Sequence, residues 1–356
     1  MKAFLVIGAV CLNLLAFRAV AETAGKPPQE ASKQADLKET HRFEKLPSLL
    51  ELTRRDALKG ESKDQADLGV KYFFGDGVPA NTNEAVQWFR KSAEQNDPSG
   101  QYWIGYAHYI GRGAPKDAVE ARKWFLKAAG AGSVGAQYQL GIIYLKGEGV
   151  DTSTKEAARW FRLAAEQENI PSHYQLGVLH YKGIGVEKNW AKALEHFQFA
   201  AERGDARAIY FTARMLSAGE GAEKNEPEAR EWLQRAESNE LLAHQIGLLL
   251  FAGEDVPKDT GAAIEWFRKA AEAGFFVSQY KLGDIFYNGK GVSVDYDEAV
   301  KWFRKAAGQG DASAQYNLGK CYFKGHGVKQ DYVAAYKWGA MSAMQTTPMG
   351  NNLRDT

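Results

Sequence analysis

Apolar residues recur along most of this chain at the three- and four-residue spacing of amphipathic helices. In the stretch ASAQYNLGKCYFKG, which starts at Ala312, the apolar positions share one helical face and the stretch ends at a glycine. The stretch YDEAVKWFRKAAGQG, which starts at Tyr296, places alanine and aromatic residues on one face and lysine and arginine on the other. Both spacings predict helices that bury a single face. Similar stretches alternate from about residue 65 to residue 343, which predicts an all-α protein built from helix pairs.

The helix pairs share one register. A Leu-Gly or Ile-Gly dipeptide marks each first helix at intervals of 36 residues, except for one interval of 34 residues that follows Ala213, which stands in a glycine position. A tryptophan lies nineteen residues after each marker, and only His196 breaks that column. A fixed period of this length predicts a solenoid, in which each repeat buries its apolar face against its neighbours. The marker glycines are Gly69, Gly105, Gly141, Gly177, Gly247, Gly283 and Gly319.

Each first helix ends at Gly-x-Gly-Val or a close relative of it. Glycine adopts a positive φ without a Cβ clash, so this pattern predicts the turn that reverses the chain. Asp295 and Asp297 are candidate caps for the second helix of their repeat. The marker glycine costs about 1 kcal/mol of helix propensity relative to alanine. We expect a tryptophan from the neighbouring helix to pack against its bare backbone.

The regular pattern fails in the middle of the chain. His196 replaces tryptophan, Ala213 replaces glycine, and Asp255 replaces a turn glycine, while the connection from Glu237 to Leu242 is two residues short. These departures predict that the central repeats deviate from ideal stacking, for example by a change in curvature. Ordinary drift with local compensation is the alternative.

The segments outside the repeats differ from them in composition. Residues 1–21 combine a lysine, a short apolar run and Ala-Val-Ala, which predicts a cleaved signal peptide, with an uncleaved anchor as the alternative. Residues 22–45 are polar and are expected to be disordered. Residues 46–60 fit the second helix of a repeat and are expected to cap the first full one. Eight repeats are then predicted over residues 61–345, with a tail over residues 346–356.

Composition bears on the choice of partner. Acidic and basic residues nearly cancel, at a formal net charge of +1, and no basic block stands out, so no nucleic-acid partner is expected. Removal of the signal peptide would leave Cys321 as the only cysteine, which excludes an internal disulfide. Cys321 occupies the position of Ile143 and Leu179 in sister repeats, which predicts a buried small side chain. We expect an exported protein without membrane insertion, in a bacterial periplasm, with secretion or surface association as alternatives.

No catalytic, metal or cofactor site is predicted. His108 and His180 occupy a position that holds tyrosine or phenylalanine elsewhere, and His173 lies two turns from His180, too far to share a metal. The Gly-x-Gly turns lack the lysine and hydroxyl residue of a phosphate loop, and they follow helices. His326 is the variable middle residue of such a turn and is expected to face solvent. No nucleophile motif and no distinct pair of carboxylates appears.

The marker, the tryptophan column and the Gly-x-Gly-Val turn together resemble the Sel1-like repeat family, which is related to the tetratricopeptide repeats. The resemblance covers residues 65 to 343 and implies a right-handed α/α solenoid of about eight helix pairs with an N-terminal capping helix. It also implies that the first helices line a concave, protein-binding face. Disulfide-rich members have been linked to penicillin binding and β-lactam hydrolysis, but this chain lacks the cysteine pair in each repeat that defines them.

The resemblance predicts a non-catalytic scaffold that binds a partner protein and is itself monomeric. Exported members include immunity proteins that neutralise a toxin such as a phospholipase, a role we favour here. Envelope adaptors, or surface factors that engage host proteins, are alternatives, and an envelope hydrolase is the rival class.

On the concave face, the stripe at positions −2, +1 and +5 from the marker predicts the partner contacts. This stripe is apolar in the first repeats and more basic in the last ones, as expected for a graded protein-binding surface. The alternative for Trp103 and Tyr106 is packing against the capping segment. The candidate residues are Val70, Phe74, Trp103, Tyr106, Ile110, Phe211, Arg214, Lys281, Asp284, Asn317, Lys320 and Lys324.

Overall fold

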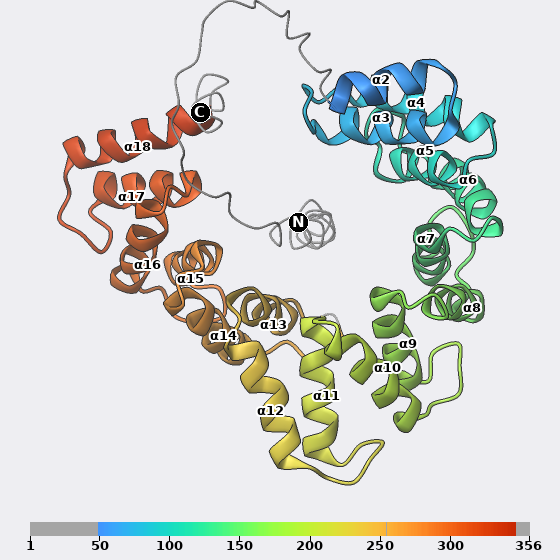
Figure 1. Ribbon diagram of the computed structural model, residues 1–356. Coiled ribbons are helices and arrows are strands. Elements are labelled where there is room, and N and C mark those ends of the chain that lie inside the picture. Colours follow the sequence, from blue (N-terminus) through green and yellow to red (C-terminus); the bar gives the residue numbers. More distant parts are fainter. Residues whose placement is uncertain (1–48, 254, 347–356) are drawn as a thin grey trace, which may run out of the picture. The chain divides into compact units, whose positions relative to one another are not determined.

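The computed structural model describes residues 49–253 and 255–346. Within these ranges the chain forms seventeen helices and no strand, and consecutive helices pack on one another (Figure 1). The predicted all-α solenoid of helix pairs is therefore confirmed. The helices are α2 (Leu49–Leu58), α3 (Ser62–Phe74), α4 (Thr82–Glu94), α5 (Pro98–Ile110), α6 (Ala118–Gly130), α7 (Val134–Lys146), α8 (Thr154–Ala165), α9 (Ile170–Lys182), α10 (Trp190–Glu202), α11 (Ala206–Ala218), α12 (Glu226–Glu237), α13 (Glu240–Ala252), α14 (Thr260–Glu272), α15 (Phe276–Asn288), α16 (Tyr296–Gly308), α17 (Ala312–Lys324) and α18 (Tyr332–Thr346).

The turns within the repeats form as the glycine pattern predicts. Each first helix ends at a glycine in the left-handed region, for example Gly75 with φ of 80° and Gly289 with φ of 64°. Each second helix from α4 to α16 begins after an asparagine, aspartate or serine whose side chain accepts a backbone N–H. Asp295 is the predicted cap of α16 and accepts from the Glu298 amide at 2.9 Å. Asp297, the other candidate, lies inside the first turn of that helix.

The packing of the marker glycine differs from the prediction. Phenylalanine, one residue after the tryptophan position, covers the bare backbone in six of the repeats. A Cβ added to Gly69 would lie 2.5 Å from the ring of Phe89, and one added to Gly283 would lie 2.5 Å from the ring of Phe303. The expectation for tryptophan was wrong because the two columns are adjacent in sequence and both are apolar, and only the helix crossing decides which ring reaches the glycine.

Two repeats solve this contact in another way. In the fifth repeat Ala213 replaces the marker glycine, and Leu233 occupies the phenylalanine position. In the eighth repeat Gly319 keeps the marker, and Gly339 stands in the phenylalanine position, so helix backbone approaches helix backbone. In every repeat, therefore, the residue at the marker position and the residue at the phenylalanine position are not both large. This rule indicates that the two helices of each repeat must approach closely at this point.

Pairs of one buried and one exposed glutamine join the two helices of a repeat, and sequence reasoning missed them. The Gln95 side chain donates to Oε1 of Gln65 at 2.9 Å and to the Gly60 carbonyl at 3.0 Å. Gln309 makes the same pair of bonds, at 2.9 and 3.0 Å, to Gln279 and to the Gly274 turn. The signal was available, because these glutamines recur at fixed offsets from the marker.

Helix α2 lies at the N-terminal end of the solenoid, within the segment that the sequence predicts to be a cap. Ala57 of this helix is 1% exposed and packs with Leu68 and Trp88. At the other end of the chain, Cys321 is fully buried, as predicted from its column. The predicted signal peptide, the polar segment 22–45 and the tail after residue 346 lie outside the described residues. Among the helices that are described, none is long and apolar enough to cross a membrane.

Candidate partner-binding surface

The apolar candidates of the first two repeats lie together on α3 and α5. All five are half-buried and pack against one core cluster that includes Phe73, Phe89 and Ile104. Each therefore combines a packing role with a surface that remains accessible. These residues are Val70, Phe74, Trp103, Tyr106 and Ile110.

Trp103 is the most firmly held member of this group. Its ring stacks on Phe89 at a centroid distance of 5.8 Å and an interplanar angle of 15°. It meets Phe74 edge-on at 5.6 Å and Tyr106 edge-on at 5.7 Å. Aromatic pairs in such geometries stabilise by about 0.5–1.5 kcal/mol beyond area burial. Trp103 therefore supports the fold of the first repeats, and Tyr106 and Phe74 present the apolar surface around it.

The basic candidates of the last repeats lie over aromatic rings. The Lys281 ammonium lies 4.6 Å from the centroid of Phe251, and that of Lys320 lies 4.8 Å from the centroid of Tyr287. Burial lowers the pKa of Lys281, with a smaller opposing effect from Asp284. Among the described residues, no carboxylate lies within ion-pair distance of Lys281 or Lys320. A half-buried cation without an acidic partner favours an anionic ligand.

The remaining C-terminal candidates differ in how far they are engaged. Asp284 accepts from Lys290 at 2.6 Å and from Asn288 at 2.7 Å, so its charge is already balanced. The Asn317 side chain donates to the Ser313 carbonyl at 3.1 Å. Lys324, at the end of α17, is exposed.

The two central candidates have unlike positions. Phe211 is only 1% exposed and stacks on Phe197 at 4.6 Å, so the prediction that it contacts a partner was wrong and it is a packing residue. Arg214 is half-buried, with its guanidinium 4.9 Å from the Tyr181 ring and 4.0 Å from a Glu220 carboxylate oxygen. Its Nε and one Nη have no hydrogen-bond partner among the described residues. Arg214 thus retains donors that a bound partner or water can satisfy.

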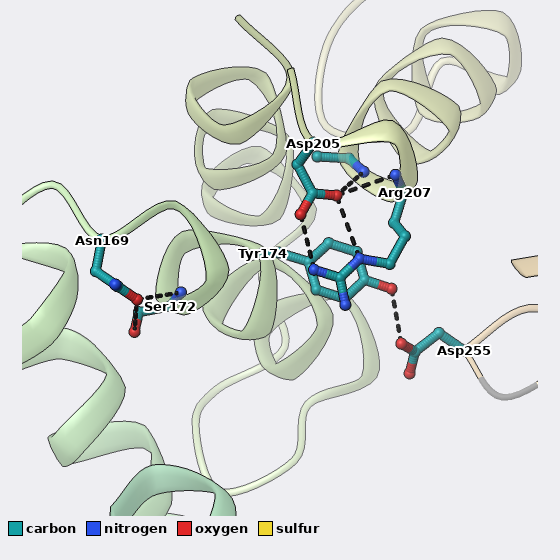
Figure 2. Close-up of polar contacts among 7 residues, drawn as sticks. Asn169, Ser172, Tyr174, Asp205, Arg207 and Asp255 are labelled. Atoms are coloured by element: carbon teal, nitrogen blue, oxygen red, sulfur yellow. Dashed lines mark hydrogen bonds and ion pairs between the residues drawn. The ribbon is translucent and has the colours of Figure 1, made fainter. Parts of the chain in front are cut away.

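A polar network joins repeats that are not adjacent (Figure 2). Asp205 caps α11 and holds Arg207, whose Nη2 lies 2.7 Å from its carboxylate. The Arg207 guanidinium lies 4.0 Å from the centroid of Tyr174, on α9. The Tyr174 hydroxyl donates to Asp255 at 2.6 Å, and Lys182 pairs with the same carboxylate at 3.2 Å. The network ties α9 of the fourth repeat to the turn after α13, across the whole fifth repeat. Burial, together with the Asp255 charge, raises the pKa of Tyr174.

The irregular positions of the sequence account for this network. In other repeats the second turn glycine lies against the start of the preceding second helix, and a Cβ on Gly149 would lie 2.9 Å from the Ala118 carbonyl carbon. Asp255 stands at the equivalent position and cannot approach in that way, because it carries a side chain. Its carboxylate instead meets Tyr174 and Lys182. The sequence marked Asp255 as irregular but could not name its partners, which lie 81 and 73 residues away.

Three histidines meet where the tryptophan column is broken. Nδ1 of His196 lies 3.1 Å from Nδ1 of His173, and its ring stacks on His180 at 5.8 Å. Burial, and then the two neighbouring histidines, lower the pKa of His196 to about 4. The other nitrogen of His173 faces the Ala165 carbonyl, and the Nδ1 of His180 faces the Glu187 carbonyl. No group of three or more potential ligands in the described ranges is arranged to hold a metal. The three rings contact one another at this break in the column, an arrangement that the spacing of the histidines along the chain did not predict.

The repeat architecture assigns the family. The family model of the Sel1 repeat matches eight consecutive segments, at residues 62–97, 98–133, 134–169, 170–205, 206–240, 242–275, 277–311 and 312–346. The chain belongs to the Sel1 repeat family. Sel1 repeats form protein-interaction scaffolds, and the solenoids of this family are generally non-catalytic. No curated protein matches the chain.

Solved structures include similar chains from bacteria. The protein c5321, a protective antigen of uropathogenic Escherichia coli strains that displays an SLR fold, is 30% identical over 83% of this chain and 72% of its own, with a TM-score of 0.53. A Sel1 repeat protein from Oxalobacter formigenes is 28% identical over 78% of this chain and 96% of its own, with a TM-score of 0.40. The immunity protein Pa5087 from Pseudomonas aeruginosa is 19% identical over 59% of this chain and 81% of its own, with a TM-score of 0.31.

Proposed function

We propose that this Sel1 repeat protein is exported and binds a partner protein along the first helices of its solenoid. The observation that carries the proposal is the pairing of two surfaces on these helices. Tyr106 and Phe74 offer apolar area on α5 and α3, while Lys281 and Lys320 on α15 and α17 offer cations that form no ion pair with a carboxylate of the described residues. Aromatic residues and desolvated charges dominate binding energy at protein interfaces. A matching partner presents an apolar segment and a separate acidic segment.

The biological role of this protein depends on which protein it binds. The resemblance to c5321 supports an exported protein that is exposed to a host, because that neighbour is described as a protective antigen. Neutralisation of a toxin, as by a periplasmic immunity protein, is the role that the family resemblance suggests. The likeness to Pa5087 is too distant to support more than the shared fold. Hydrolysis of a β-lactam or muropeptide by the purified protein would contradict a purely binding role.

Affinity capture with matched variants tests the proposal. The purified chain is used as bait in periplasmic and host-secretion extracts, and the captured protein is then purified for direct titration. We expect Tyr106→Ala and Lys320→Glu each to weaken binding at least about tenfold. Lys155→Glu, an exposed change on the second helix α8, serves as the control and should bind as the parent does. We avoid Trp103→Ala as the main variant, because loss of the stack on Phe89 would also weaken the fold.

Three results would contradict the proposal. The first is a captured protein that binds the parent and both variants equally. The second is equal loss of binding in the Lys155→Glu control, which would indicate that binding follows total charge. The third is a variant that loses binding only because its urea unfolding midpoint has fallen below that of the control.

A further inference from the structure

The last repeat exposes apolar side chains at positions that other repeats bury. Tyr336 of α18 is 78% exposed, whereas Val300, at the same position one repeat earlier, is 3% exposed. Phe323 of α17 is 58% exposed, whereas its equivalent Tyr287 is 9% exposed. A following repeat covers these positions elsewhere in the solenoid. We call this surface the end face; it also includes Tyr316, Tyr332, Val333 and Met341, which are 62%, 60%, 63% and 45% exposed.

Helix α18 also lacks most of the charged side chains that other second helices expose to solvent. Lys337 is its only charged residue in fifteen. Val333 stands where α16 carries Asp297, and Met341 stands where α16 carries Lys305. Both substitutions place an apolar side chain at a position that is exposed in α16 and in α18. Depletion of charge with enrichment of aromatic residues and methionine is the composition of an interface core.

The other end of the solenoid shows the contrast. There the capping helix α2 covers the first repeat and exposes the charged residues Arg54 and Arg55, and Lys59 in the turn that follows it is also exposed. Solenoids need terminal elements with a polar outer face to remain soluble. The end face lacks that feature within the described residues. Residues 347–356, which lie outside the described ranges, include two large apolar side chains, Met349 and Leu353.

We propose that the end face is a self-association surface on which a second copy of this chain docks about a two-fold axis. In such an isologous contact the same patch meets itself, so a patch with net charge would repel its copy. The named side chains of the end face are uncharged, so the patch avoids that repulsion and gains from burial on both sides. This dimer is proposed in place of the monomer that the family resemblance predicts. The end face shares the helix α17 with the partner surface proposed above, but none of its named residues belongs to that surface.

Sedimentation equilibrium of the chain, prepared without an added N-terminal tag, tests the proposal. We expect a mass twice that of one chain, with a dissociation constant that rises at least about tenfold in Tyr336→Arg and in Val333→Asp. Both changes restore residue types that the fold already accepts, because Arg230 and Asp297 occupy the equivalent positions in earlier repeats. Val119→Glu, on the exposed side of α6, is the matched control and should leave the dimer intact. Circular dichroism checks that each variant keeps its helix content.

Several outcomes would overturn the proposal. A parent chain that stays monomeric up to its solubility limit is one. A dimer that resists both end-face variants, or that dissociates equally in Val119→Glu, is another. A monomeric parent that dimerises only in Met349→Ser/Leu353→Ser would show that the chain's own tail occupies the end face.

Discussion

A single added methyl group at Gly141 tests the central packing rule of these repeats. The Cβ of Gly141→Ala would lie 2.5 Å from Cδ1 of Phe161, whose ring is fully buried. Such a distance forces the ring or the helix to move, because real Cβ contacts are longer. The helical glycine Gly130 has open space where a methyl group would lie, with no neighbouring atom within 4 Å, so Gly130→Ala is the matched control.

The sign of the effect follows from two opposing contributions. Replacing a helical glycine by alanine stabilises by about 1 kcal/mol when space is available. Overpacking a core costs about 1–3 kcal/mol, and the buried position of Phe161 places this case toward the upper end. We therefore expect Gly141→Ala to lower the free energy of unfolding by about 1–2 kcal/mol. Gly130→Ala should raise it by up to about 1 kcal/mol.

The fifth repeat suggests how the damage can be repaired. It carries Ala213 with Leu233 in place of the glycine and the phenylalanine. The double variant Gly141→Ala/Phe161→Leu copies that solution and should recover stability relative to Gly141→Ala. We expect a favourable coupling energy of at least about 1 kcal/mol between the two sites. Phe161→Leu alone should destabilise by about 1 kcal/mol, because it leaves unfilled space.

Urea unfolding followed by circular dichroism measures all four variants. Repeat proteins can unfold in segments. Free energies of unfolding are therefore compared only between variants whose transitions have the same dependence on urea concentration. A Gly141→Ala variant that is as stable as the parent would refute the reasoning. So would a double variant whose loss equals the sum of the two single losses.

Further expectations concern the central network, pH and the buried thiol. Asp255→Asn should lower the free energy of unfolding by about 1–2 kcal/mol, since it weakens the bonds to Tyr174 and Lys182; in urea titrations Tyr174→Phe should add little to it. His196 has a folded pKa of about 4, below the ordinary histidine value of 6.5, so the unfolded chain takes up this proton first as pH falls. Stability should therefore drop by up to about 3 kcal/mol between pH 7 and pH 4, and His196→Phe should flatten this dependence; equal slopes in both proteins would refute it. Burial raises the pKa of Cys321 to about 11, so a thiol reagent should label it slowly at pH 8 and rapidly in urea, and fast native labelling would contradict its burial.

The periodic sequence was sufficient to predict the fold. Helix pairs, left-handed glycine turns such as Gly75 and the buried position of Cys321 all follow from local spacing repeated eight times. Repetition makes such inference strong, because one column samples the same environment in every repeat. The same reasoning correctly assigned Asp295 as a helix cap, since a cap depends only on residues nearby in the chain.

Tertiary structure decided the features that depend on helix crossing or on contacts between distant repeats. Phenylalanine rather than tryptophan covers Gly69, and the difference of one residue in a helix is a rotation that spacing cannot orient. His196 joins His173, and Asp255 reaches Tyr174, through contacts that occur once and therefore have no column to reveal them. The helix pairs, turns and caps could be determined from the sequence by itself, because they depend on residues that are near in the chain; the ring that faces each marker glycine and the contacts between distant repeats required the three-dimensional arrangement, because only packing brings distant residues within bonding distance.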